Sequence, residues 1–303
     1  MAVIEVEGLR KSYGDLAAVR GIGFTVEEGE VVAVLGPNGA GKTTTVEILE
    51  GYRRRDAGRV RVLGVDPAEG GADYRQEIGI VLQSCAVEPY LSVREVLTMY
   101  AGIYRQPRPI DEVIALVGLD EKADSRVKSL SGGQQRRLDL ALGLVGDPRL
   151  VFLDEPTTGF DPAARRQAWD VVRSLCRLGK TVLLTTHYMD EAQALADRVV
   201  MIAHGEIVAQ GTPDEIGGRA DADAQIRFRL PPGVVAADLP LAATVEAGDI
   251  VRIDAALPTA ALHELTAWAL ARGDELSHLS VSRPSLEDVY LQLIDGPPAA
   301  GDA

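Results

Sequence analysis

Cysteine is scarce in this 303-residue chain: Cys85 and Cys176 are its only two, and they lie far apart in the sequence. A fold held together by a disulfide framework is therefore excluded, and we expect both to be free, buried thiols. Long apolar runs are missing too, since no stretch approaches the ~18 uncharged residues that a membrane-spanning helix needs. The N-terminus has neither the charged start nor the apolar middle of a secretion signal. These absences predict a cytoplasmic protein.

Positive charge is also in short supply. Lysine and arginine total 31 against 45 acidic residues, which gives a formal net charge of −14. A surface of that sign disfavours DNA or RNA as the main partner and offers no attraction to anionic lipids. Hydrophobic residues make up 46% of the chain, so it is able to bury a core. The length fits one large domain or two ordinary ones.

Apolar segments that read as strands alternate along the chain with segments of helical spacing. The run VVAVL at 31–35 is apolar throughout, which is typical of a central parallel strand covered on both faces. A glycine-rich turn and a helix over 42–49 follow it, and the segment 92–145 has the three- and four-residue spacing of helices. Buried strands recur at LVFLD and TVLLTT. This alternation predicts an α/β fold with a parallel sheet.

Composition shifts at TPDEIGGRADADA, residues 212–224, a polar stretch of small residues that favours a linker. We therefore divide the chain into a main domain over 1–217 and a small α+β domain over 218–295. In the second domain a helix is expected over about 258–272. The tail over 296–303 is expected to be disordered.

The stretch GPNGAGKT, Gly36–Thr43, matches the pattern G-x-x-x-x-G-K-[ST] at every fixed position. Its glycines let backbone N–H groups wrap the β- and γ-phosphates of a nucleotide. Lys42 supplies a point charge to the same oxygens, and the Thr43 hydroxyl is a ligand for Mg²⁺. The strand before it and the helix after it are the context that a phosphate-binding loop requires. A glycine-rich turn of purely structural use is the weaker alternative.

Polar side chains end three of the predicted strands. VFLDE delivers Asp154 and Glu155 to the carboxyl end of a strand, where ligands bind in open α/β sheets. We expect Asp154 to hold Mg²⁺ through water and Glu155 to polarise an attacking water. Gln83 ends the strand GIVLQ and His187 ends TVLLTTH, which places both with the acids. Taken alone, each has the plainer interpretation of a structural residue at a strand end.

A second glycine pair lies in LSGGQ, residues 130–134, ahead of a helical segment. Small residues at a helix N-terminus let backbone N–H groups approach an anion, and the helix dipole favours negative charge there. This stretch is therefore a second candidate phosphate-binding site, although it has no lysine of its own.

The motifs occur in the order phosphate loop, Gln83, LSGGQ, VFLDEP, TTGFDP and TTH, and together they resemble the ATP-binding subunits of ABC transporters. The resemblance covers about residues 1–215. It implies a P-loop NTPase fold with a parallel core sheet, an antiparallel β subdomain and a helical subdomain. It also implies that two copies dimerise head to tail around two ATP, so that LSGGQ of one chain faces the phosphate loop of the other. The second loop then needs no lysine, because it serves a nucleotide in trans.

The resemblance also assigns roles residue by residue. The catalytic set is Glu155 as base, His187 as the switch at the γ-phosphate, Gln83 and Lys42, and the Mg²⁺ ligands are Thr43, Gln83 and Asp154. One departure is Phe160, where leucine is commoner, and both are apolar. The nucleotide contacts are Tyr13 (stacking on adenine), Gly36, Pro37, Asn38, Gly39, Ala40, Gly41, Lys42, Thr43 and Thr44 in cis, and Ser131, Gly132, Gly133, Gln134 and Asp161 in trans.

The ending RPSLEDVYLQLIDG resembles the C-terminal extension of drug-exporter ATPases of the daunorubicin-resistance type. That likeness implies export of drugs, lipids or related compounds by a separate integral-membrane permease, with this chain on the cytoplasmic face of the membrane. Two alternatives stay open: a soluble ABC-type ATPase that acts on a macromolecular partner, and an importer ATPase. A non-enzymatic scaffold is disfavoured because Glu155 and His187 are intact.

Overall fold

The computed structural model describes residues 1–81, 87–219 and 222–295. The chain divides into two compact units, a core unit over Met1–Pro213 and a C-terminal unit over Asp214–Ala303. The division falls inside the polar segment 212–224 in which a linker is expected.

The core unit is built on a sheet whose central strands are parallel. Strand β3 (Val31–Leu35) is fully buried, and its parallel neighbours are β7 (Thr181–Thr186) and β8 (Arg198–Ala203). Strand β6 (Leu150–Asp154) pairs with β7, so the strands that precede the phosphate loop, the acidic pair and His187 are neighbours. The predicted α/β fold with a parallel sheet is confirmed. The full order is β5-β6-β7-β3-β8-β9, with β5 at Ile78–Val81 and the antiparallel β9 at Glu206–Gly211.

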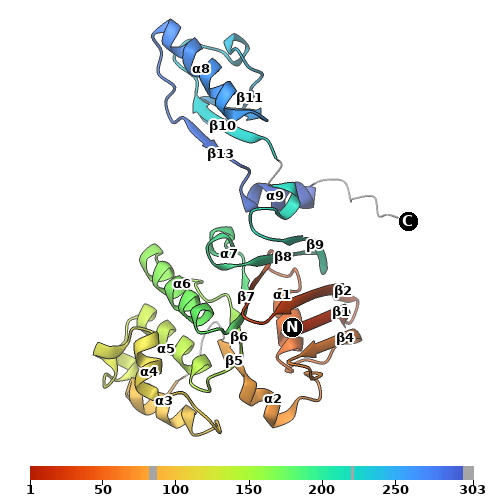
Figure 1. Ribbon diagram of the computed structural model, residues 1–303, viewed down its shortest axis with the longest axis vertical. Helices are drawn as coiled ribbons and strands as arrows, with labels where there is room; N and C mark the ends of the chain where they lie inside the picture. Colours follow the sequence, from red (N-terminus) through yellow and green to blue (C-terminus); the bar gives the residue numbers. More distant parts are fainter. Residues whose placement is uncertain (82–86, 220–221, 296–303) are drawn as a thin grey trace. The chain divides into compact units, whose positions relative to one another are not determined.

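A second sheet of the core unit is antiparallel, with the order β2-β1-β4. Figure 1 shows it on one side of the parallel strands, as the implied antiparallel subdomain. It shares an apolar cluster with helix α1 and the core sheet, through buried side chains such as Ile4, Phe24, Leu49 and Phe152. The bounds are Ala2–Tyr13 for β1, Leu16–Glu27 for β2, Ala57–Val62 for β4 and Lys42–Leu49 for α1.

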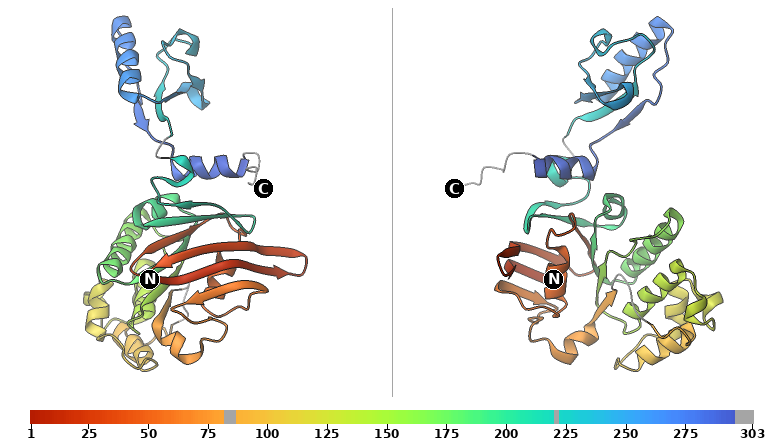
Figure 2. Two further views of the ribbon diagram at one scale, coloured as in Figure 1. Left: turned by 45° about the vertical axis from the view of Figure 1, so that its right-hand side comes forward. Right: turned by 180° about the vertical axis from the view of Figure 1, so that it is seen from behind.

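Helices α3 (Val93–Ala101), α4 (Ile110–Leu116) and α5 (Gly132–Leu144) pack together away from the antiparallel sheet (Figures 1 and 2). They confirm the helical section predicted over 92–145. In the parts of the chain that the structure describes, every helix is too short or too polar to cross a membrane. The core unit also contains α2 (Gly71–Glu77), α6 (Pro162–Arg177) and α7 (Met189–Leu195), with 3₁₀ turns at Asp120–Lys122 and Val127–Ser129.

The C-terminal unit has an antiparallel sheet with the order β11-β12-β10-β13. Helix α8 (Pro258–Arg272) forms where it is predicted and packs on this sheet, where Leu265 shares an apolar cluster with Phe228 and Ile253 (Figure 2). The predicted disordered tail, 296–303, lies outside the described residues. The other elements are β10 (Ala224–Arg229), β11 (Thr244–Val245), β12 (Ile250–Ala255), β13 (Ser280–Ser282) and α9 (Leu286–Asp295), with 3₁₀ turns at Ile216–Gly218, Ala236–Asp238 and Ala247–Asp249.

Candidate functional site

The loop over residues 36–41 joins β3 to α1 and runs close to a neighbouring strand. Gly41 has a φ of +102°, and a Cβ there would overlap the carbonyl oxygen of Ala18 in β2. Glycine adopts this positive φ without strain and has no Cβ to overlap that oxygen. Helix α1 starts at Lys42 without a side-chain cap at Gly41, so its first backbone N–H groups keep their donor capacity. A helix start of this kind binds an anion such as a phosphate.

Lys42 is almost fully buried, with 4% of its surface exposed. Its ammonium group donates hydrogen bonds to the carbonyl oxygens of Gly36 (2.7 Å) and Pro37 (3.1 Å). Burial lowers the pKa of Lys42, and this effect outweighs the opposing influence of Glu155 and Asp154. The Nζ atom lies 3.9 Å from Glu155 Oε1. The loop therefore holds one cation in place beside the acidic pair.

The acidic pair at the end of β6 is fixed to β7. Thr185 Oγ1 donates a hydrogen bond to Asp154 Oδ1 (2.6 Å), and Glu155 N donates to the carbonyl and hydroxyl oxygens of Thr185 (3.1 Å each). Glu155 has a φ of +46°, and the left-handed region costs a non-glycine residue about 1–2 kcal/mol. Such strain persists only where neighbouring contacts enforce it. The chain thus turns sharply after β6 and brings the Glu155 carboxylate next to Lys42.

The carboxylate of Glu155 is enclosed by groups from other segments. Its Oε1 lies 3.3 Å from Nδ1 of His187, which directly follows β7. Its Oε2 accepts a hydrogen bond from Thr158 Oγ1 (3.1 Å). Only 11% of the Glu155 side chain is exposed. A carboxylate held in this way is suited to accept a proton from a water molecule bound beside it.

A cavity of about 500 Å³ brings most of the predicted cis contacts together. Its volume lies in the range of small-ligand sites. Leu16, Ala18 and Thr158 line it without having been predicted from sequence, whereas Gly36 and Ala40 of the loop are buried. The predicted residues that line it are Tyr13, Pro37, Asn38, Gly39, Gly41, Lys42, Thr43, Thr44, Glu155 and His187.

The residues of this cavity fit a nucleotide with a divalent cation. The half-exposed ring of Tyr13 offers a flat apolar surface to a base, while Lys42 and the start of α1 offer positive charge to phosphates. Mg²⁺ prefers oxygen ligands: the Thr43 hydroxyl in the cavity lining is one, and the Asp154 carboxylate at the end of β6, next to Glu155, would be another. Gln83, the third predicted ligand, lies outside the described residues.

The LSGGQ segment forms the start of α5. Ser131 is the N-cap: Gln134 N donates to its Oγ (3.3 Å), and its own N–H donates to Gln134 Oε1 (3.0 Å). Ser131 and Gly132 are exposed, and the serine hydroxyl keeps its proton for another acceptor.

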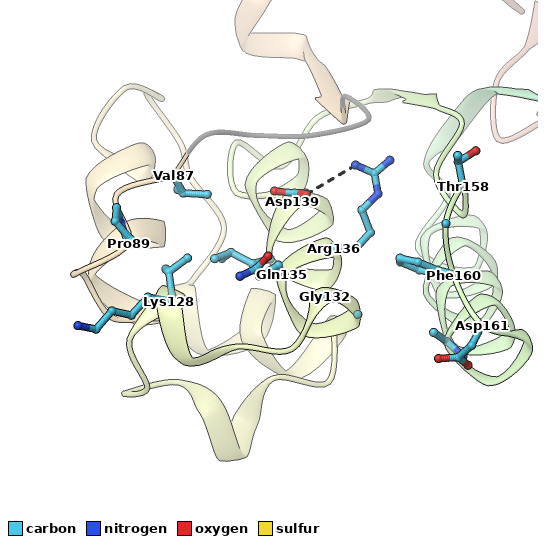
Figure 3. Close-up of a pocket in the computed structure, with 15 residues that line it drawn as sticks. Val87, Pro89, Lys128, Gly132, Gln135, Arg136, Asp139, Thr158, Phe160 and Asp161 are labelled. Atoms are coloured by element: carbon cyan, nitrogen blue, oxygen red, sulfur yellow. Dashed lines mark hydrogen bonds and ion pairs between the residues drawn. The ribbon is translucent and has the colours of Figure 1, made fainter.

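None of the five predicted trans contacts lines the cavity that contains the phosphate loop. Gly132, Gly133 and Asp161 line a second cavity of about 490 Å³ (Figure 3). Asp161 also has a structural task, since its Oδ1 caps α6 by accepting hydrogen bonds from the N–H groups of Ala163 and Ala164 (2.9 Å each). One chain therefore does not bring LSGGQ to its own phosphate loop in this cavity.

Three residues that contact the acidic pair or its loop were not predicted from sequence. Thr158 lies in the motif TTGFDP and Thr185 in TTH. In the sequence, only a hydroxyl near the end of a predicted strand indicates that either could contact the acidic pair. Arg136 follows LSGGQ closely, and its Nε donates to the carbonyl oxygen of Pro156 (3.1 Å). These contacts join segments that lie far apart in the chain.

The burial of Glu50, just after α1, leads us to expect that the stability of the fold depends on pH. It is 5% exposed, and burial, followed by the charges of Asp154 and Glu47, raises its pKa from 4.5 to about 8. The folded state therefore binds more protons than the unfolded state between these values. We expect the unfolding free energy to fall as pH rises from 4.5 to 8, by at most ~1.4 kcal/mol per pH unit.

Urea unfolding at pH 5 to 8 measures this effect. Glu50→Gln should remove most of the slope, and the exposed Glu112→Gln should keep it. Equal slopes in wild type and Glu50→Gln would contradict a neutral Glu50 in the folded state.

Family models match both units of the chain. Residues 19–158 match the ABC transporter model. Residues 224–285 match a model described as the C-terminal domain of ABC transporter domain-containing proteins.

Relatives of this chain are similar to it over nearly its whole length. The daunorubicin resistance ATP-binding protein DrrA3 of Streptomyces coeruleorubidus is 39% identical, over 96% of this chain and 95% of that protein. The Nod factor export ATP-binding protein I of Rhizobium sp. (strain N33) is also 39% identical, over 96% of each chain.

Solved structures match about 70% of the chain. Protein cbiO1 from Clostridium perfringens, part of the ABC transporter complex cbiONQ, has a TM-score of 0.64 and 29% identity over 71% of this chain and 90% of its own. The dimeric bacterial ABC transporter cassette MJ0796 has a TM-score of 0.61 and 25% identity over 69% of this chain and 98% of its own.

Proposed function

Because this chain belongs to the ABC transporter ATP-binding proteins, and is an ATPase of that kind, we propose that it powers an exporter. In this proposal two copies close around two Mg²⁺-ATP, and hydrolysis and release reopen them. The movement drives a separate integral-membrane permease, which exports drugs, lipids or related compounds.

Two kinds of observation support the proposal. The geometric one is the convergence of Lys42, Glu155 and His187 on one cavity, with Oε1 of Glu155 3.9 Å from the lysine and 3.3 Å from the histidine. The comparative one is that the two relatives described above are named for export or drug resistance, one for resistance to daunorubicin and one for export of Nod factor. An importer or a macromolecule-directed ATPase has no comparable support from these two names.

The reaction is in-line attack of water on the γ-phosphorus of ATP. Glu155 orients that water and accepts its proton, because its carboxylate is fixed by Thr158 and stands beside the cavity. Lys42 binds the β- and γ-phosphate oxygens as a fixed positive charge. His187, next to Glu155, contacts the γ-phosphate and stabilises charge there. A bound Mg²⁺, held by Thr43 and Asp154, would neutralise phosphate charge.

Lys42→Ala is expected to weaken ATP binding by about 10- to 100-fold, since it removes a buried charge-assisted contact. Equilibrium binding of a fluorescent ATP analogue measures the loss. Lys122→Ala, in the 3₁₀ turn Asp120–Lys122 of the helical part, is the control and should bind as wild type does. Unchanged affinity in Lys42→Ala would count against the phosphate-loop role.

Partner identification tests the transport proposal. The tagged chain is recovered from its own cells after mild detergent treatment of membranes, and co-purifying proteins are quantified against an untagged strain. A protein with several membrane spans at about equal stoichiometry is the expected result. Recovery only with soluble enzymes, ribosomes or DNA would leave the ATPase chemistry standing and overturn transport as its purpose.

A further inference from the structure

A buried arginine connects the LSGGQ helix to the loop that carries Glu155. Arg136 lies on α5 two residues after Gln134 and is 6% exposed. Its guanidinium donates from Nε to the carbonyl oxygen of Pro156 (3.1 Å) and from Nη2 to those of Asp154 and Glu155 (3.4 Å each). Three successive carbonyls around the acidic pair thus face one rigid cation.

The side chain of Arg136 is itself held in place on its helix. Its Nη1 lies 3.6 Å from Asp139 Oδ2, one turn further along α5, and Asp139 is 7% exposed. Figure 3 shows this ion pair and the guanidinium directed from α5 toward the loop with Thr158 and Phe160. A planar guanidinium with several donors fixes the orientation of its acceptors better than a single ammonium would.

The loop that receives these hydrogen bonds is the strained one. Glu155 has a φ of +46°, and a residue in that region relaxes unless its neighbours prevent it. Thr185 holds the N–H side of Glu155, and Arg136 holds the carbonyl side. The conformation of Glu155 is therefore fixed from β7 and from the LSGGQ helix together.

We infer that Arg136 is a positioning residue that couples α5 to the catalytic glutamate of the same chain. A rotation or shift of α5 would move the guanidinium and release the strained turn. The Glu155 carboxylate is therefore oriented toward the attacking water only while α5 keeps the position seen in this structure. This inference rests on the proposed role of Glu155 as the base.

The test is ATP turnover by Arg136→Gln in the full chain. We expect kcat to fall on the order of 10- to 100-fold, because the orientation of the Glu155 carboxylate is disturbed. The ATP dissociation constant should be unchanged, because Arg136 does not line the proposed ATP cavity. Arg136→Lys should recover part of the loss, since it keeps the positive charge and has three donors on a single nitrogen. It also serves as the test variant if Arg136→Gln does not fold. The matched control is Arg137→Gln on the same helix, whose side chain donates to Gly118 O instead. It should turn over within about twofold of wild type.

Two readouts separate positioning from a general defect. Amide hydrogen exchange should rise at Glu155, Thr157 and Thr158 in Arg136→Gln and stay unchanged in α1. Nucleotide recovered from the enzyme after mixing with Mg²⁺-ATP should be mainly ATP, because binding survives while hydrolysis is slow. Loss of bound nucleotide, or normal kcat in Arg136→Gln, would overturn the inference.

Glu155→Gln, measured in parallel, separates this inference from the proposal under it. If Glu155→Gln still hydrolyses ATP at a normal rate, the base assignment fails and the role of Arg136 fails with it. If Glu155→Gln is inactive and Arg136→Gln is normal, only the inference about Arg136 fails.

Discussion

Glu155→Gln should lower ATP turnover by about 10³-fold while ATP affinity stays at the wild-type value. Glutamine has the same size and accepts the hydrogen bond from Thr158, so the loop keeps its shape. It cannot accept a proton from water, because an amide is not a base at neutral pH. Steady-state phosphate release and equilibrium ATP binding measure the two quantities.

The control for this variant is Glu112→Gln, which removes the same charge from an exposed position at the start of α4. It should hydrolyse ATP at the wild-type rate. Near-normal phosphate release by Glu155→Gln would show that another group activates the water.

Ser131→Arg should reduce hydrolysis by more than 100-fold and leave ATP binding by the single chain intact. Ser131 is exposed at the start of α5, where the head-to-tail dimer would place the partner's γ-phosphate. An arginine there fills that space and also removes a helix cap, which costs about 1 kcal/mol. Ser131 does not line the cavity that contains the proposed ATP-binding loop, so the substitution leaves that loop unchanged.

Phosphate release and binding of ATP at low protein concentration test this variant. Ser280→Arg, at an exposed position of β13 in the C-terminal unit, adds the same bulk and charge as a control. Full hydrolysis by Ser131→Arg would refute the trans role of LSGGQ.

Contiguous motifs explain why much of the site could be predicted from sequence. The phosphate loop, the Asp154–Glu155 pair and the LSGGQ cap each depend on residues within a few positions, and their local geometry follows from glycine, strand and cap chemistry. The buried strands β3, β6 and β7 are likewise indicated by apolar runs, which end one or two residues before Pro37, Glu155 and His187 in the cavity lining.

The remaining features depend on contacts between distant segments. Nothing near Arg136 in the sequence shows that its side chain meets the carbonyl of Pro156, twenty positions away. The left-handed φ of Glu155 has no glycine to signal it, because tertiary contacts enforce it. The neutral form of Glu50 likewise depends on the three-dimensional burial of an ordinary-looking helix end. Gln83 stays a prediction, since it lies outside the described residues.

The glycines of LSGGQ and the loop over residues 36–41 line different cavities of one chain, so under the proposed function the rate of ATP hydrolysis depends on protein concentration. Under the proposed head-to-tail arrangement a free chain binds ATP but lacks half of a complete site, so hydrolysis in dilute solution would rise with the square of protein concentration. A permease that holds two copies would replace this dilution by a high effective concentration. ATP hydrolysis would then be confined to assembled transporters, and unassembled subunits would keep their bound ATP without hydrolysing it.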